Sequence, residues 1–455
     1  MKRPDNNHFF VCKFTLQIRD DLTGKLIQES HGENFVGNQP IRHAKWLLRN
    51  QYKTGLTSIN ATDTDYAVSS DSNVLVLTDS TLAEDPASEW LMPGGLVGWA
   101  DKASYAGGNI HRGNPNPSQL DANPAFTKWV WDWPTHAAVG TINSVGFIQS
   151  SDYGIWDQES ISYLTQKATI EQTYSGVADN MEYLARANQN LAFGCSGTTV
   201  IYVLNGTYNV TTTYNVRGQF TAVRGIAWDS DNNFLWVIGD NSANRRIAAY
   251  NSAGILQTGP FTTTTRSYSY LAYDGAKLWT IVPIPGDQYT AWSINTSNGA
   301  DISFFTFTTT RWGSSFYGGP YTNLDVRGLC WEPTYQRLWV RTRNPNGSFN
   351  QYLDLASSLS AYDRNGNKQA VDIGLASVWD SASGTNTSLT RRTWPMGDID
   401  VIDATQFVVP LDLNTSTSGV HRVRGTGLTT RSLLSSPVVK TNTQTLKVIY
   451  TINYI

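Results

Sequence analysis

The sequence predicts an all-β protein, and three observations support this fold class. The chain of 455 residues contains 16 Trp, 22 Tyr and 16 Phe, which favour strands together with β-branched residues. The aromatic residues stand in a background rich in Asn, Gly, Ser and Thr, of which Asn, Gly and Ser favour turns. Only one segment has the apolar spacing of a helix. Strands joined by short polar turns are therefore expected along most of the chain.

The N-terminal region is expected to contain a hairpin and two further strands. Residues 9–18 alternate in polarity toward their end, and Thr23-Gly24 forms a turn into a second strand at 25–27. Short apolar or aromatic runs predict further strands at 74–77 and 129–133. These strands would belong to one sheet system at the start of the chain.

One helix is expected, from about Pro40 to Tyr52. Asn38 precedes it as an N-cap, and Pro40 suits an early helical position, where its missing N–H would have no partner. Apolar residues then follow at helical spacing, and Gly55 lies beyond the end.

An internal repeat changes the character of the chain after residue 150. Copies begin near 183, 225, 270, 328 and 398, and the first three are spaced at the roughly 40 to 50 residues of a four-stranded propeller blade. Each clear copy has a strand, a short polar turn and a second strand with a Trp. A single such sheet leaves both faces exposed, so a ring of them is expected, with about five to seven blades.

The copy at 225–254 carries the clearest family likeness. It includes GIAWDSDNNFLWVIGD, followed by NRRIAAYNSAG. This pattern resembles NHL-type propeller repeats, and the other copies match it loosely. The resemblance implies a β-propeller fold and no particular activity, because one propeller fold serves many functions.

Three segments outside the repeat resemble structural proteins of tailed bacteriophages, in the style of minor tail and fibre proteins. They are residues 33–41 with the helix that follows, 127–147, and 439–455. In such proteins a strand like 141–148 is commonly followed closely by a closing strand like 444–454. Here about 280 residues of repeat lie between the two, so the resemblance implies a propeller inserted into a β-sandwich.

The expected organisation is a discontinuous β-sandwich that docks onto a virion, formed by residues 1–150 with 432–455, and a β-propeller at 151–431. Closely spaced strand ends at a sandwich edge accept an inserted domain. The C-terminal alternation from Leu446 to Tyr454 fits a half-buried strand. The alternative is that this last strand closes the propeller ring.

Composition excludes several classes of protein. Lys+Arg 34 against Asp+Glu 37 leaves a net charge of -3, which argues against a general nucleic-acid clamp. No apolar run approaches the roughly 18 residues of a membrane span. The basic start of the chain is followed by polar residues, so we expect no secretory signal and assembly in a host cytoplasm. Three separated cysteines predict neither disulfides nor a zinc site.

No catalytic motif is present, and no cofactor is predicted. The six His show no metal-ligand spacing, and neither a nucleophile elbow nor a Walker loop occurs. A glycosidase would need two carboxyl groups roughly 5 to 10 Å apart at the axial mouth. The Asp residues of the repeat sit mostly in turns, so we expect no enzymatic activity.

Two local segments are candidate sites. Asp229 and Asp231 resemble the opening of a calcium loop, although a tight turn between two strands explains them without a metal. The Gly- and Pro-rich segment 311–323 could instead recognise a ligand, because its aromatic faces can stack on sugars or anchor a protein interface. Its candidate binding residues are Trp312, Phe316, Tyr317 and Tyr321, and the alternative is that they cover the bottom of an enlarged blade.

The function that these observations predict is a structural component of a tailed-phage virion, placed in the tail as a fibre, tip or adaptor-attached protein. Its propeller would be exposed for host-surface or partner binding. Expected partners are other virion proteins, a bacterial surface glycan and further copies of the same chain on the particle. The alternatives are a capsid-surface decoration or head-fibre protein, a glycan-cleaving tail enzyme, and a bacterial propeller adhesin.

Overall fold

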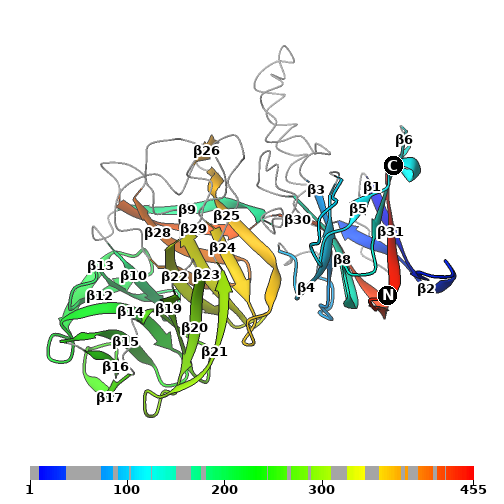
Figure 1. Cartoon of the computed structure of the whole chain (residues 1–455). Helices are drawn as coiled ribbons and strands as arrows, with labels where there is room; N and C mark the ends of the chain where they lie inside the picture. The colour runs from blue at the N-terminus through cyan, green and yellow to red at the C-terminus, as the bar shows by residue number, and fades with distance from the viewer. Residues whose placement is uncertain are drawn as a thin grey trace, which may run out of the picture. The chain divides into compact units, whose positions relative to one another are not determined.

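In the computed structural model most of the described residues form β-strands, and the chain divides into two compact units (Figure 1). One unit is residues 168–425, and the other joins residues 1–167 to 426–455. The described residues are 10–36, 73–85, 91–101, 104–123, 125–149, 165–175, 181–242, 244–263, 268–284, 288–308, 325–343, 358–380, 385–387, 398–412, 418–425 and 427–454. The all-β prediction is confirmed. The predicted helix at 40–52 lies outside these residues.

The discontinuous unit is built on a ten-stranded sheet that brings both ends of the chain together. Its strands follow the order β4-β3-β8-β30-β2-β1-β31-β7-β5, and β6 also pairs with β7. Their bounds are β1 Phe10–Asp20, β2 Leu26–Val36, β3 Asn73–Thr78, β4 Leu96–Ala100, β5 Asn114–Pro115, β6 Asp121–Asn123, β7 Phe126–Trp133, β8 Gly140–Gln149, β30 Leu428–Lys440 and β31 Gln444–Tyr454.

The C-terminal strand lies in the middle of this sheet system. β31 pairs antiparallel with β1 on one side and with β7 on the other, where Val448 faces Trp131. Leu446, Val448 and Tyr450 are buried at alternate positions in a core that also contains Trp131 and Trp133. The last strand therefore belongs to this unit and is not part of the propeller ring.

The two strands that flank the inserted unit are neighbours. β8 and β30 pair antiparallel, and the pairing reaches Ile148 opposite Leu428. About 280 residues of chain separate these two positions. The second unit is therefore inserted at the end of what would otherwise be a simple hairpin.

The second unit is a β-propeller of four-stranded antiparallel sheets. Three sheets stand alone, in the orders β10-β11-β12-β13, β14-β15-β16-β17 and β18-β19-β20-β21. A fourth, nine-stranded sheet joins β22-β23-β24-β25 to β9-β29-β28-β27, with β26 paired to β25. The first three sheets comprise β10 Tyr183–Arg186, β11 Leu191–Cys195, β12 Val200–Asn205, β13 Val210–Asn215, β14 Ala222–Asp229, β15 Phe234–Asn241, β16 Asn244–Tyr250, β17 Leu256–Thr262, β18 Ser269–Tyr273, β19 Leu278–Ile284, β20 Gln288–Ile294 and β21 Asp301–Thr308. The remaining strands are β9 Thr165–Ser175, β22 Asp325–Glu332, β23 Arg337–Arg343, β24 Ser358–Tyr362, β25 Lys368–Asp380, β26 Thr385–Thr387, β27 Asp400–Asp403, β28 Gln406–Asp412 and β29 Ser418–Gly425.

The innermost strands close a ring. β10 contacts β14, β14 contacts β18, β18 contacts β22, β22 contacts β27, and β27 returns to β10. The sheet that contains β27, β28 and β29 is completed by β9, which comes from the start of the unit. The propeller predicted from the repeat is therefore confirmed, and its first strand lies beside its last.

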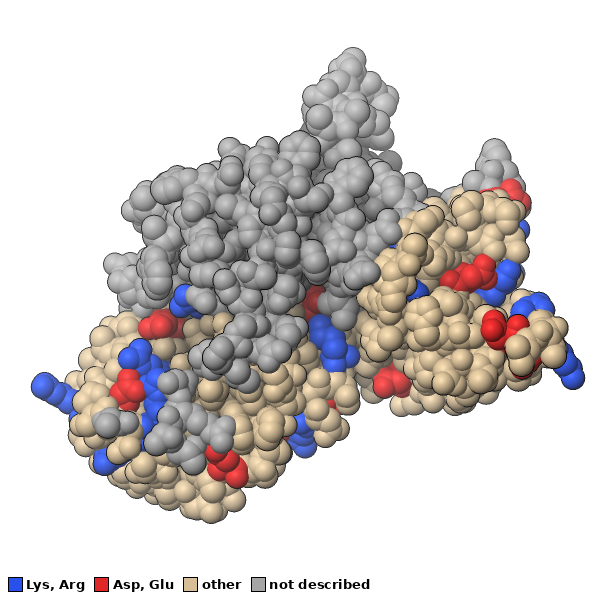
Figure 2. Space-filling model, viewed as in Figure 1, with Lys and Arg blue, Asp and Glu red and all other residues tan. Residues whose placement is uncertain are grey.

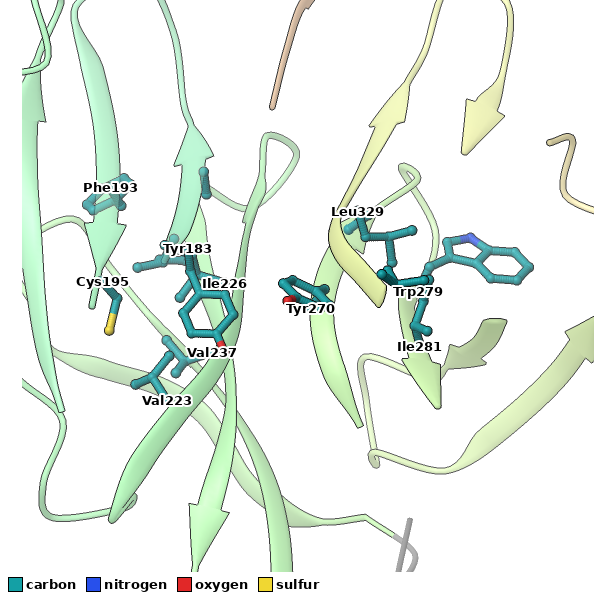
Figure 3. Close-up of a cluster of buried hydrophobic side chains, with 14 of the residues drawn as sticks. Tyr183, Phe193, Cys195, Val223, Ile226, Val237, Tyr270, Trp279, Ile281 and Leu329 are labelled. Carbon is teal, nitrogen blue, oxygen red and sulfur yellow. The ribbon is translucent and has the colours of Figure 1, made fainter. Parts of the chain in front are cut away.

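The core of the propeller consists of the apolar residues that recur in each repeat. Figure 3 shows Tyr183, Ile226, Tyr270 and Leu329 on neighbouring innermost strands, and all four are buried in one cluster. In the clear copies a Trp of the second strand is paired with a small residue of the first. Burial of such side chains contributes roughly 1.5–3 kcal/mol each, so the ring is stabilised as one hydrophobic unit.

Candidate functional site

One position, in or just before each of the five innermost strands, is mostly charged. The strand pairings align Ala185 with Phe193, Ala227 with Trp236, Ala272 with Trp279, Cys330 with Trp339 and Val401 with Phe407. We define the axial ring as the five residues that lie three positions before the first-named residue of each of these pairs. Its members are Glu182, Arg224, Ser269, Arg327 and Asp398. It therefore has two basic, two acidic and one hydroxyl side chain, whereas the following residues are largely apolar and buried.

Irregular strand pairing positions two of these side chains. The register between β14 and β15 shifts between Val223 and Gly225, so Arg224 has no cross-strand partner. The same shift occurs between β22 and β23 around Arg327. A bulged residue leaves the regular alternation of the strand, and such bulges often re-aim a side chain near a functional site.

The glycine after each bulged arginine makes room for the neighbouring strand. A Cβ at Gly225 would lie 2.7 Å from the carbonyl carbon of Tyr270. A Cβ at Gly328 would lie 2.8 Å from Oδ1 of Asp398. Neither position tolerates a side chain without movement of its neighbour.

Arg224 is held by an ion pair on its own sheet. Its Nε donates to Oδ2 of Asp240 at 2.8 Å, and Arg245 donates to the other oxygen of the same carboxylate. The Arg224 side chain is 41% exposed, so this pair is partly screened by solvent. Desolvation, and then the charge of Arg224, lower the pKa of Arg245 to about 10.

Asp398 is the fully buried member of the axial ring. Its Oδ1 accepts hydrogen bonds from the backbone N–H groups of Leu329 at 2.7 Å and Ile399 at 2.9 Å. Its own backbone N–H donates to the carbonyl of Glu182 at 2.8 Å, which ties β10 to the segment before β27. No donor from the described residues reaches Oδ2.

Burial raises the pKa of two carboxyl groups in this part of the axial ring. Desolvation raises the pKa of Asp398 well above its ordinary value, and the two backbone hydrogen bonds oppose the shift. Desolvation likewise raises the pKa of Asp400, two residues further on, to about 7. The Asp400 carboxylate accepts from the backbone N–H groups of Val401 and Arg186. Perturbed carboxyl groups gathered at one place mark a candidate functional site.

Two tyrosines lie beside the ring, next to Glu182 and Ser269 in the chain. The rings of Tyr183 and Tyr270 are 5.7 Å apart, and both side chains are buried (Figure 3). The Tyr183 hydroxyl donates to Oε1 of Glu182 at 3.2 Å. Desolvation raises the pKa of both phenols, so both stay neutral and act as hydrogen-bonding groups.

The residues predicted as a calcium site serve the turn after β14. Oδ1 of Asp229 accepts from the backbone N–H groups of Asp231 and Asn232, each at 3.0 Å. Oδ2 accepts from the Asn232 amide and from the indole of Trp236. Asp231 accepts from the hydroxyl of Tyr273 at 3.1 Å. Among the described residues, no three His, Cys, Asp or Glu side chains gather to hold a metal ion.

The other predicted site lies outside the described residues. This applies to all four aromatic candidates, Trp312, Phe316, Tyr317 and Tyr321, because residues 309–324 form one of the gaps. A ligand role for them stays a prediction.

The axial ring was missed by sequence reasoning although a signal for it exists. The copies at 225 and 328 are both preceded by Val-Arg, so that each reads Val-Arg-Gly at its start. An arginine before the glycine in two copies, and a carboxylate at the same place in two others, points to one charged position. Glu182 and Asp398 fall in the weaker copies near 183 and 398, where alignment needs the strand register, and Ser269 precedes the clear copy at 270.

Surface charge on the described residues is mixed. Figure 2 shows acidic and basic side chains interspersed over the visible described face, without a large area of one sign. No described helix has the length and apolarity that a membrane span requires.

No family model and no curated protein matches the sequence. Solved structures that resemble the chain include the glutaminyl cyclase of Myxococcus xanthus, with 14% identity and a TM-score of 0.37 over 58% of this chain and 98% of that one. The WD40 β-propeller domain of Doa1 is 9% identical, with a TM-score of 0.29 over 57% of this chain and 97% of that one. The Cps50 (Swd1) β-propeller domain of Myceliophteria thermophila is 8% identical, with a TM-score of 0.29 over 56% and 99%. At these TM-scores nothing about activity or ligand follows.

Proposed function

We propose that this protein is a structural component of a tailed-phage virion, with a sandwich that docks on the particle and a five-bladed propeller exposed for binding. One observation carries the proposal. The described parts of all three segments that resemble phage tail and fibre proteins belong to one sheet system, in β2, β7, β8, β30 and β31. Segments at both ends of a long chain thus form one module, as a docking domain requires.

The position of the inserted unit supports a display role. Because β8 and β30 are paired neighbours, the sandwich can form its sheet without any strand of the propeller. Such an arrangement lets the propeller vary for recognition while the docking module keeps its partner. Several copies on one particle would add avidity to weak individual contacts.

The proposed binding function is non-enzymatic. The two carboxyl groups of the axial ring make hydrogen bonds within the protein: Glu182 accepts from Tyr183, and Oδ1 of Asp398 accepts from two backbone N–H groups. We therefore expect no reducing-sugar release when the protein is incubated with the envelope polysaccharide of the host. Release that disappears in Glu182→Gln and Asp398→Asn would make the protein a glycan-cleaving enzyme.

Electron microscopy of gold-labelled particles tests the virion assignment. An antibody raised against the propeller, residues 168–425, is bound to purified particles of the phage that encodes the chain. Gold at the tail or its appendages is the expected result. Gold over the capsid would move the protein to the decoration or head-fibre class, and particles without gold, with no peptide of the chain by mass spectrometry, would overturn the proposal.

A further inference from the structure

Exposed apolar side chains gather at one end of the discontinuous unit. Eight large apolar residues are exposed in the described part of this unit, and six of them lie at that end. The other two are Leu82 and Leu120. Single exposed apolar residues are ordinary on a protein surface, whereas a cluster of them marks an interaction site. We call the six residues the apolar end: Leu22, Leu26, Ile27, Ile110, Val139 and Val439.

The strand order places these residues together. Leu22 lies in the turn between β1 and β2, Val139 directly precedes β8, and Val439 is the next-to-last residue of β30. Because β1, β2, β30 and β8 are antiparallel neighbours in this order, those positions lie at the same end of the sheet. The chain leaves for the inserted unit at the opposite end of β8 and β30, where Ile148 faces Leu428.

Hydrogen bonds between the turns join the apolar end into one surface. The backbone N–H of Asp21 donates to the carbonyl of Thr443 at 3.2 Å, which connects the β1–β2 turn to the β30–β31 turn. The ammonium group of Lys440 donates to two carbonyl groups of the segment between β7 and β8, at 2.9 and 3.0 Å. In that segment the N–H of Ala138 donates to the carbonyl of Ile110 at 2.8 Å.

A β-bulge exposes two consecutive apolar residues of the hairpin. Ile18 pairs with Gln28 and Arg19 pairs with Leu26, so Ile27 has no cross-strand partner. A bulge interrupts the regular pairing of a strand and is one of the devices that keep a sheet edge from pairing with another chain. The hairpin therefore favours a contact made by side chains over the addition of a strand.

The exposed charges of the hairpin tip match those of an identical tip. Asp21 and Lys25 are exposed on the two sides of Leu22, and they are opposite in sign. The next charged residues along β1, Arg19 and Asp20, are also opposite in sign. In a twofold contact the Asp21 of each copy can approach the Lys25 of the other. A tip with charges of one sign would repel its own copy, so the mixed signs favour a second copy as the partner.

We propose that the apolar end is a twofold interface, at which a second copy of this chain packs its own apolar end. Removal of Leu22, Leu26 and Ile27 from water in both copies drives the association, and pairs of Asp21 with Lys25 orient it. The interface uses no residue of the propeller. It goes beyond the proposed function and does not depend on the virion assignment.

Sedimentation analysis of the purified full chain tests this interface. The unaltered chain is expected to be a dimer at micromolar concentration and to dissociate on dilution. Leu22→Asp should raise the Kd of the dimer at least about a hundredfold, because a twofold interface loses the same apolar contact twice. Leu22 is 95% exposed within one copy, so this variant should keep the near-UV circular dichroism of the folded protein. Ile255→Asp is the matched control, because Ile255 is 60% exposed on the propeller and should leave the Kd unchanged.

Charge exchange at the hairpin tip identifies the second copy as the partner. Asp21→Lys makes both tips of a dimer basic and Lys25→Asp makes both acidic, so each variant alone should dimerise about tenfold more weakly. A mixture of the two variants should form a heterodimer. The double variant with both exchanges should dimerise like the unaltered chain. Both side chains are exposed, so these changes leave the core intact if Leu22→Asp fails to fold.

Three outcomes would overturn the inference: the unaltered chain is a monomer at every concentration, Leu22→Asp dimerises as well as the unaltered chain, or the single charge variants do. These outcomes are independent of where the protein lies on a particle. A dimer that depends on Leu22, in a protein absent from every particle, would remove the virion and keep the interface. Gold-labelled tails with a monomeric chain would do the reverse.

Discussion

The indole Nε1 of Trp279 donates a hydrogen bond of 2.9 Å to Oδ2 of Asp274. The same bond joins Trp236 to Asp229 at 3.1 Å in the preceding sheet. In both sheets the other carboxylate oxygen accepts two backbone N–H groups of the turn. One aspartate therefore closes the turn and holds the tryptophan of the next strand, which explains the spacing of Asp and Trp in the repeat.

The fourth copy lacks this hydrogen bond. Comparing it with the third copy therefore measures what the bond contributes to the free energy of unfolding. Glu332 replaces the aspartate and accepts from the N–H groups of Thr334 and Tyr335, while the buried Nε1 of Trp339 has no partner among the described residues. Trp279→Phe should therefore destabilise the propeller by about 1 kcal/mol more than Trp339→Phe. Scanning calorimetry of the two variants measures the difference, and equal losses would contradict it.

The two glycines of the axial ring should resist substitution. Gly225→Ala places a Cβ against the backbone of Tyr270, and Gly328→Ala places one against Asp398 and the backbone N of Ile399. Each should lower the free energy of unfolding of the propeller by about 1–3 kcal/mol through overpacking. Gly218→Ala is the control, since nothing lies within 4 Å of its Cβ position. A melting temperature unchanged in both ring variants would refute the close approach.

The buried carboxyl of Asp398 should make stability depend on pH. Its pKa is raised in the folded protein, so from about its ordinary value of 3.8 upward the unfolded chain loses this proton while the folded chain keeps it. The folded state then binds more protons, and its stability falls as pH rises, by up to about 1.4 kcal/mol for each pH unit until the folded pKa is reached.

Asp398→Asn removes that dependence. The variant should match the unaltered chain near pH 4 and melt at a higher temperature at pH 8, as followed by calorimetry across this range. Asp400, whose pKa is about 7, titrates in the same window but is present in both proteins, so the difference between them reports Asp398. A difference in melting temperature that does not change with pH would show that the carboxyl is not shifted.

The discontinuous unit should fold without the propeller. Because Ile148 faces Leu428 across the β8–β30 pair, replacing residues 149–427 by Asn-Gly leaves a two-residue hairpin turn between paired residues. The shortened chain should unfold cooperatively, with the tryptophan fluorescence of a buried core from Trp99, Trp131 and Trp133. Emission typical of solvent-exposed tryptophan before any denaturant is added would show that the discontinuous unit depends on its insert.

Chelation of divalent cations should not affect the turn at Asp229. Both carboxylate oxygens already accept hydrogen bonds from the protein, and a calcium ion would have to displace them. Excess EGTA is expected to leave the melting temperature of the propeller unchanged, and a fall reversed by added calcium would restore the metal interpretation.

Local sequence patterns predicted the strands well, because the interactions that form strands and turns act between residues close together in the chain. The Thr23-Gly24 turn, for example, is made by Asp20 accepting from the Thr23 N–H and by a positive φ of 67° at Gly24. The Asp-Trp spacing of the repeat likewise reflects contacts within one sheet. The axial ring could not be predicted in the same way, since Glu182 and Asp398 lie 216 positions apart in the chain and meet only when the ring closes.

The sequence by itself determined the all-β class, the repeat and the identity of the turn residues, because side-chain periodicity and turn chemistry act over a few residues. Only the tertiary structure decided which strand completes the ring and where β31 pairs. It also decided which residues form the axial ring. Those features depend on strand register and on burial between distant segments: a one-residue shift exchanges the faces of a strand, and the closed ring removes Asp398 from water.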